Sequence, residues 1–156
     1  MGEQCLQRLV LPDQAPLPNP YAEADRSQAV ADLLAQNRFD PAGLPAGPYA
    51  LYLEIREGRL ILDIRSVTEA PLRIIALALG PFRRLIKDYH MVVASHEAAV
   101  TEGGSDARIQ AIDMGRRGLH NEGAELLAAR LDGRVTLDFE TARRLFTLVC
   151  ALHQRI

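Results

Sequence analysis

Most residues of this chain that could do chemistry lie in one stretch, from Asp113 to Glu125. It reads Asp-Met-Gly-Arg-Arg-Gly-Leu-His-Asn-Glu-Gly-Ala-Glu, and it combines two adjacent arginines with a histidine, an amide and carboxylates. Guanidinium groups bind phosphate and carboxylate groups through paired hydrogen bonds. We therefore predict that Arg116 and Arg117 bind an anion, which a phosphate-bearing or acidic partner would supply.

The same stretch has a catalytic interpretation. His120 would act as general acid or base, Glu122 or Glu125 would orient it, and the arginines would hold an anionic substrate. Ion pairs between neighbours on a helix, such as Asp113 with Arg117, produce similar clusters without chemistry. We therefore predict a non-enzymatic binding or regulatory module, with a small hydrolase or transferase as the alternative.

Three glycines, Gly115, Gly118 and Gly123, decide how these side chains are presented. Each costs about 1 kcal/mol relative to alanine in a helix interior. If they break the helix, the backbone amides between the first two glycines could form an anion-binding nest. If the helix is continuous, Ile112, Gly115, Leu119 and Leu126 form a seam narrow enough for another backbone to approach closely. Ser105 and Gly133 are suited to cap the two ends of one long helix, which favours a continuous but kinked helix.

Adjacent arginines also occur at Arg83-Arg84 and at Arg143-Arg144. If these pairs converge with Arg116-Arg117, they form one basic surface for a phosphate or an acidic partner, and we count the first pair among the predicted anion-binding residues. The alternative is local pairing, as between Arg84 and Asp88, four residues apart. The net charge of −2 and the scarcity of aromatic residues among the arginines argue against nucleic acid as a partner.

The sequence predicts neither a metal nor a cofactor. His120 and Glu122 are two residues apart and therefore point in different directions on a helix, and no HExxH or paired-cysteine motif occurs. His96 and His153 lie on apolar stripes of predicted helices, which is typical of histidines in a core.

The composition is that of an ordinary globular protein, with 48% hydrophobic and 24% charged residues in a chain of 156. We expect a single domain over 1–156, which includes a proline-rich, extended arm over 12–20. No apolar run approaches the roughly twenty residues of a membrane span. Cys5 and Cys150 show no disulfide pattern and are predicted to be free thiols. We therefore predict a cytoplasmic protein without membrane contact.

A β-hairpin is the clearest local prediction. Residues 49–56 and 59–65 alternate between the two faces of a strand, and Glu57-Gly58 separates them as a tight turn. The apolar run 72–79 is predicted to add a third strand, which gives a meander. Two shorter strands are predicted, at 6–11 and 134–137.

Apolar side chains at helical spacing predict four helices. Pro81 suits the first turn of the second helix, Ser105 caps the third and Asp138 caps the last. The predicted helices cover about 22–37, 80–102, 105–132 and 138–153. The last helix is apolar on more than one face, so it is either central to the core or shared in a homodimer, and we predict a homodimer through it.

This order of elements predicts an α+β fold, with a small, mainly antiparallel sheet and helices packed on one face. Four runs of the chain resemble those of one family. They are Gly-Pro-Tyr-Ala-Leu-Tyr-Leu at 47–53, Pro-Phe-Arg-Arg-Leu-Ile-Lys-Asp-Tyr at 81–89, Ala-Ile-Asp-Met-Gly-Arg-Arg-Gly-Leu-His-Asn-Glu-Gly at 111–123, and Asp-Phe-Glu-Thr-Ala-Arg-Arg-Leu-Phe-Thr-Leu at 138–148. From about Tyr21 to its C-terminus the chain resembles uncharacterised protein family 0262, a family of alphaproteobacteria. The resemblance implies a bacterial cytoplasmic protein, and it implies no activity, ligand or catalytic residue.

Overall fold

The predicted hairpin forms the centre of a four-stranded sheet in the computed structural model, which describes residues 3–12 and 15–153. Strands β3 (Tyr49–Arg56) and β4 (Arg59–Ser66) pair in antiparallel register, with Arg56 opposite Arg59. Glu57 and Gly58 have φ angles of 52° and 73°, as a two-residue turn of this kind requires. The sequence prediction of this hairpin is confirmed.

The remaining two strands of the sheet flank the hairpin. Strand β5 (Pro71–Ala78) pairs antiparallel with β4 and completes the predicted meander. Strand β1 (Leu6–Val10) pairs with β3, but the two run parallel. The sheet order is β1-β3-β4-β5, so the sheet is mixed and the expectation of mainly antiparallel pairing holds for the meander alone.

A buried amide holds β1 in place. The Asn37 side chain accepts a hydrogen bond from the Leu6 amide at 2.7 Å and donates to the Leu6 carbonyl at 2.9 Å. It also donates to the carbonyl of Leu33 in the last turn of the preceding helix. Asn37 therefore anchors the first residue of β1 to the end of α1, through a contact between residues 31 positions apart in the chain.

The short strand predicted at 134–137 is present as β6 (Val135–Leu137), although it does not join the main sheet. It pairs antiparallel with β2 (Phe39–Pro41), a strand that was not predicted from the sequence. Pro41 is at the end of β2, where its missing amide hydrogen costs no bond in the middle of a sheet.

The four predicted helices are present as α1 (Pro20–Ala35), α2 (Arg83–Thr101), α3 (Asp106–Leu131) and α4 (Phe139–Leu152). A 3₁₀ turn, η1 (Gly80–Phe82), precedes α2. The residues Gly80-Pro81, where the helix was predicted to begin, belong to this turn, and the α-helix begins at Arg83. Ser105 accepts a hydrogen bond from the Arg108 amide, and Asp138 accepts one from the Thr141 amide, as the capping predictions require. Helix α3 is continuous, so its glycine-rich part forms no anion-binding nest.

The proline-rich arm is shorter than the predicted segment 12–20. Pro20 is already the first residue of α1, and the Asn19 side chain caps this helix by accepting from the amides of Tyr21 and Ala22. Residues 13 and 14 of the predicted arm lie outside the described part of the chain. Residues 15–19 contain neither helix nor strand.

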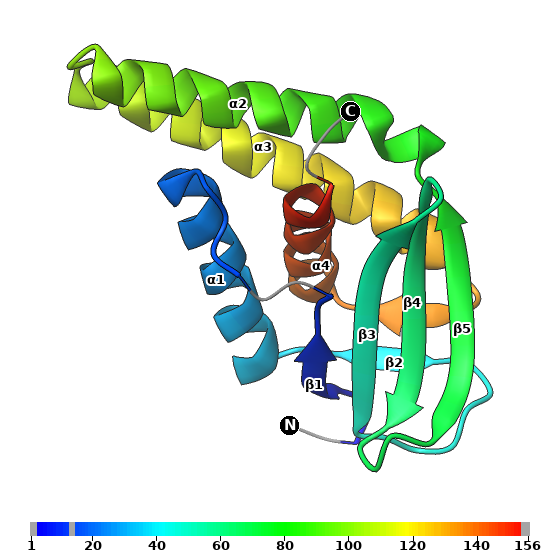
Figure 1. The fold of residues 1–156 in the computed structure, drawn as a ribbon. Coiled ribbons are helices and arrows are strands. Elements are labelled where there is room, and N and C mark those ends of the chain that lie inside the picture. The colour runs from blue at the N-terminus through cyan, green and yellow to red at the C-terminus, as the bar shows by residue number, and fades with distance from the viewer. Residues whose placement is uncertain (1–2, 13–14, 154–156) are drawn as a thin grey trace.

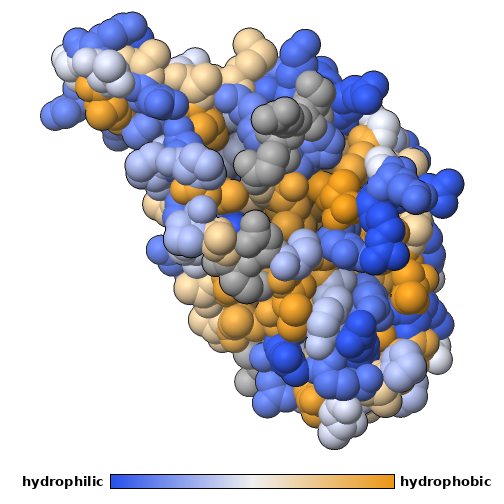
Figure 2. Space-filling view, in the orientation of Figure 1, coloured by the Kyte–Doolittle hydropathy of each residue, from blue (hydrophilic) through white to orange (hydrophobic). Residues whose placement is uncertain are grey.

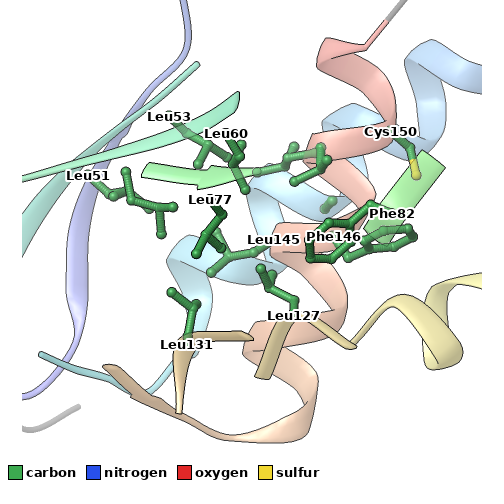
Figure 3. Packing of buried hydrophobic residues seen from close by; sticks show 14 of the residues in the cluster. Leu51, Leu53, Leu60, Leu77, Phe82, Leu127, Leu131, Leu145, Phe146 and Cys150 are labelled. Atoms are coloured by element: carbon green, nitrogen blue, oxygen red, sulfur yellow. The ribbon is translucent and has the colours of Figure 1, made fainter. Parts of the chain in front are cut away.

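The helices gather on one side of the sheet, where α2 and α3 run side by side and project beyond the sheet (Figure 1). Helix α4 lies between α1 and the sheet, below α2 and α3 in this view. Leucines of the sheet, among them Leu51 and Leu60, face Leu127 of α3 and Leu145 of α4 across the core (Figure 3). The α+β prediction with helices on one face is therefore confirmed.

The apolar faces of α4 are covered within this chain. Nine of its fourteen residues are buried, from Thr141 to Ala151, and Phe146 and Cys150 are completely inaccessible. Of the two explanations for its composition, the central position is the one seen. The predicted homodimer through this helix stays a prediction, without an exposed apolar face of α4 in its favour.

Hydrophilic residues cover most of the face shown in Figure 2, and hydrophobic residues are visible in its middle, between the helices and the sheet. Among the residues that the structure describes, none of the helices has the length and apolar character needed to cross a membrane.

Candidate functional site

A buried polar network joins α1, α2 and α3, and Asp25 of α1 is at its centre. One carboxylate oxygen accepts a hydrogen bond from Arg116 Nη1 at 2.7 Å. The other is 2.9 Å from His120 Nε2 and 2.9 Å from the Tyr89 hydroxyl. The Asp25 side chain is 9% exposed and that of His120 is 1% exposed, so these bonds are shielded from water. Three groups from two other helices therefore depend on one carboxylate.

The spacing of α3 explains how two of these groups reach Asp25 together. Arg116 and His120 are four residues apart and lie on the same side of the helix. One turn further along, Gly123 is packed so closely that an added Cβ would be 2.1 Å from the Phe146 ring of α4. This close approach of α3 to α4 buries His120 completely. The group that approaches Gly123 is an aromatic side chain. The backbone approach predicted at Gly115 is not seen, since no described atom outside its own helical turns lies within 4 Å of a Cβ added there.

Charge balance in the network favours an ionised carboxylate. Burial raises the pKa of Asp25. The hydrogen bond from His120 and the charges of His120 and Arg116 together lower it by more, so the pKa lies below the ordinary value. Burial raises the pKa of the Tyr89 hydroxyl, and the nearby Asp25 charge raises it again. Tyr89 therefore stays a neutral donor. Since an ionised carboxylate only accepts, His120 Nε2 must carry the shared hydrogen.

Arg116 is held from a second side by Asp113 and Tyr21. Its Nε donates to Asp113 Oδ1 at 2.9 Å and to the Tyr21 hydroxyl at 3.0 Å, and Tyr21 donates to Asp113 at 2.6 Å. The Tyr21 ring stacks on the His96 ring, with centroids 3.7 Å apart. Burial lowers the pKa of Arg116, and the hydrogen bond to Asp113 and the Asp25 charge reverse this and raise it above its ordinary value. The Arg116 guanidinium therefore already donates hydrogen bonds to Asp25, Asp113 and Tyr21 within the protein.

A hollow of about 200 Å³ opens beside this network, between α1, α3 and α4. We call it the arginine hollow, because two of the three arginine pairs line it. Its lining residues are Asp25, Gln28, Ala29, Asp32, Arg116, Arg117, His120, Arg143, Arg144 and Thr147.

Two buried nitrogen atoms of the lining residues have no hydrogen-bond partner. They are His120 Nδ1 and Arg144 Nε. The other nitrogens of Arg144 have only distant contacts, at 3.6 Å to Glu140 and 3.5 Å to the carbonyl of Gln36. Because buried polar groups are normally satisfied, the hollow has a capacity for hydrogen bonding that the protein leaves unused.

The other two arginines of the hollow are also incompletely paired. Arg117 is 68% exposed, and its closest ion-pair contact is 3.4 Å, to Asp113. Arg143 contacts Glu140 at 3.0 Å. Arg117, Arg143 and Arg144 are therefore the guanidinium groups that a ligand in the hollow could contact, whereas Arg116 is occupied.

The first predicted arginine pair lies elsewhere. Arg84 forms ion pairs with Asp88 and with Glu122 on the outer side of α2 and α3. Arg83 is exposed. The pKa of His153 is lowered mainly by the burial of that histidine, and the charge of Arg83 lowers it a little more. The three arginine pairs therefore do not form one surface. Only Arg116-Arg117 and Arg143-Arg144 come together, in the lining of the arginine hollow.

The predicted acid–base partners of His120 are separated from it in the structure. Glu122 points to Arg84, and Glu125 is exposed. The carboxylate that contacts His120 is Asp25, 95 residues earlier in the chain. Its position held a usable signal, because Asp25 is on the same helical stripe as the buried residues Ala29 and Leu33, and an acidic group in that place requires a partner.

The histidines predicted for the core are less buried than His120. His96 is partly exposed and stacks on Tyr21, and His153 is partly exposed as well. The carbonyl of His153 contacts His90 Nε2 at 2.5 Å. Apolar spacing therefore misassigned the buried histidine, since His120 faces Tyr89 and Phe146.

A larger hollow of about 420 Å³ lies on the outer face of the sheet, but its charges are paired among themselves. Arg65 forms an ion pair with Asp63 at 2.7 Å, and Arg56 forms one with Glu54. Within the described ranges, no three His, Cys, Asp or Glu side chains are arranged to hold a metal ion. The arginine hollow is therefore the candidate site.

Comparison with known proteins agrees with the resemblance seen in the sequence. The model of the uncharacterised protein family UPF0262 matches residues 4–155, which extends the similarity to the N-terminal strand. A UPF0262 protein of Granulibacter bethesdensis is 62% identical over 146 residues, which cover 88% of this chain and 82% of that protein. One of Acidiphilium cryptum is 58% identical, over 88% of this chain and 84% of the relative.

A more distant UPF0262 protein, of Rhizobium etli, is 43% identical over 99% of this chain and 98% of its own length. No solved structure matches the chain. The match of the family model over nearly the whole sequence and the identity to these relatives establish that the chain belongs to uncharacterised protein family UPF0262.

Proposed function

We propose that this protein is a binding module that takes up a small anion in the arginine hollow. Arg144 is the principal contact, and Arg117 and Arg143 complete the basic wall. Arg116 and Asp25 serve to hold α1 and α3 together behind it. We place this function in the cytoplasm, because the two cysteines of the sequence show no disulfide pattern, as is usual in reducing compartments.

The observation that carries the proposal is the state of Arg144. Its side chain is 21% exposed, yet it has no contact with an acceptor shorter than 3.5 Å among the described residues, and its Nε is buried without a partner. A guanidinium in this position has lost water without gaining a close acceptor, which is unfavourable for the protein alone. An anion that accepts two parallel hydrogen bonds would supply what is missing.

The size of the hollow limits the ligand. Pockets for drug-sized molecules measure about 300–1,000 Å³, and the arginine hollow is smaller, at about 200 Å³. It suits a phosphate, a small carboxylate or the corresponding end of a larger molecule.

The proposal is tested by titration calorimetry with inorganic phosphate. Phosphate is expected to bind the unmodified chain, and Arg144→Gln is expected to weaken binding by about tenfold or more, because hydrogen bonds to charged groups contribute roughly 1.5–3 kcal/mol. Arg84→Gln is the matched control, since Arg84 forms its ion pairs away from the hollow. Equal phosphate binding by both variants, or weaker binding by the Arg84 variant alone, would refute the proposal.

A second candidate function is acid–base catalysis by His120, as in a small hydrolase or transferase. The observation that favours it is the pairing of His120 Nε2 with Asp25, while Nδ1 of the same ring, which lines the hollow, has no partner. Turnover of p-nitrophenyl phosphate that His120→Gln abolishes, with phosphate binding retained, would support catalysis. Absence of turnover by a protein that binds phosphate would support the binding module.

A further inference from the structure

We infer that the ligand of the arginine hollow carries an ammonium group as well as an anionic group. This inference rests on the proposed function and adds the second half of the ligand. It is drawn from the wall of the hollow opposite the arginines, which α1 contributes and which has the opposite charge.

Helix α1 presents Asp25, Gln28 and Asp32 to the hollow, at positions i, i+3 and i+7 of one helical face. Asp25 is occupied, since it accepts hydrogen bonds from Arg116, Tyr89 and His120. Asp32 is different. Its carboxylate accepts from Gln28 Nε2 at 2.8 Å, and no cationic nitrogen of the described residues lies within 4.0 Å of it.

The arginine hollow therefore holds an unpaired carboxylate on one wall and an underused guanidinium on another. Asp32 and Arg144 both line it, but the distance between their charged atoms exceeds the 4.0 Å limit of an ion pair. Opposite charges so placed would gain from a shorter contact. A ligand that is positive at one end and negative at the other fills this gap and satisfies both residues together.

A plain anion is a poorer fit, because the Asp32 charge in the lining of the same hollow repels it while the arginines attract it. Repulsion of the wrong ligand is how binding sites commonly gain specificity. The ligand class is therefore a small molecule with a carboxylate or phosphate at one end and a primary ammonium at the other, such as an amino acid or an aminoalkyl phosphate.

The experiment compares two pairs of probes by titration calorimetry on the full chain. The carboxylate pair is β-alanine and propionate, and the phosphate pair is O-phosphoethanolamine and ethyl phosphate. In at least one pair the aminated member is expected to bind about tenfold more tightly, as one charge-assisted hydrogen bond accounts for. Which pair shows the preference identifies the anionic group.

Asp32→Asn is expected to remove this preference and to leave, or to strengthen, binding of the plain anion. Asp88→Asn is the matched control, because Asp88 pairs with Arg84 outside the arginine hollow, and it is expected to keep the preference. Equal binding of aminated and plain probes to the unmodified chain would overturn the inference while the proposed anion site stands. A preference that survives Asp32→Asn would also overturn it. Failure of all four probes and of phosphate to bind would overturn the proposed function itself.

Discussion

Replacing Asp25 by asparagine tests whether the buried network holds the helices together. The Asp25 carboxylate accepts hydrogen bonds from three groups and is 9% exposed. The amide is similar in size, so the change removes a charge and one acceptor oxygen without making a cavity. Arg116 and His120 would then lose their buried anion, while Arg116 would keep Asp113 as a partner.

The expected cost is about 3 kcal/mol, at the lower end of the roughly 3–5 kcal/mol measured when one partner of a buried ion pair is removed. We choose the lower end because Arg116 keeps its bond to Asp113. For a chain of this length, 1 kcal/mol corresponds to about 2–4 °C, so the melting temperature should fall by roughly 6–12 °C.

Urea denaturation followed by circular dichroism measures this free energy, and a thermal scan gives the melting temperature. Asp32→Asn is the control, because it makes the same chemical change on the same helix where the carboxylate has no ion pair. Its cost should stay within about 0.5 kcal/mol, as for most surface substitutions. If Asp25→Asn costs no more than this control, the network does not stabilise the fold and the reasoning is wrong.

Three further predictions follow from the same contacts. Gly123→Ala should lower the free energy of unfolding in urea by about 1–3 kcal/mol, because the added Cβ would overlap the Phe146 ring. Gly118 has open space around it, so Gly118→Ala should raise the free energy of unfolding by up to about 1 kcal/mol. An unchanged free energy of unfolding for Gly123→Ala would contradict the close packing. Asn37→Ala should cost at least about 2 kcal/mol in the same assay, since it leaves buried backbone groups without partners, and a smaller loss would mean that water replaces the amide. The depressed pKa of Asp25 contributes stability that is complete above the unfolded pKa of about 3.9 and is lost as pH falls through the lower folded pKa. Urea midpoints measured between pH 5 and pH 2 should therefore fall more steeply for the unmodified chain than for Asp25→Asn. Parallel profiles would contradict this linkage.

Local signals predicted the elements of this fold well. The turn at Glu57-Gly58 and the caps at Ser105 and Asp138 depend on residues within four positions of one another, and all three are present. The pairing of β1 with β3 and that of β2 with β6 were not predicted. They join residues about 40 and about 100 positions apart, respectively, and hydrophobic periodicity within a segment does not show which distant strand it pairs with. Asn37 anchors the first residue of β1, and as a polar residue in a loop it gives no local signal of this role.

The candidate site was predicted in part for the same reason. Arg116, Arg117 and His120 are close in the sequence, and the structure keeps them at one hollow. Asp25 and Arg144 come from other helices, so their contribution depends on how α1 and α4 pack on α3. Local pairing, by contrast, correctly explains Arg84, whose partner Asp88 is one helical turn away.

The central position of α4 has a consequence for the synthesis of this protein. During translation, the sheet and the three preceding helices emerge before the helix that fills the space between them. Until Leu152 has left the ribosome, leucines such as Leu51 and Leu127 have no apolar surface of α4 to cover them. A chain truncated before α4 would leave this part of the apolar cluster exposed, and exposed apolar surface of this kind favours aggregation.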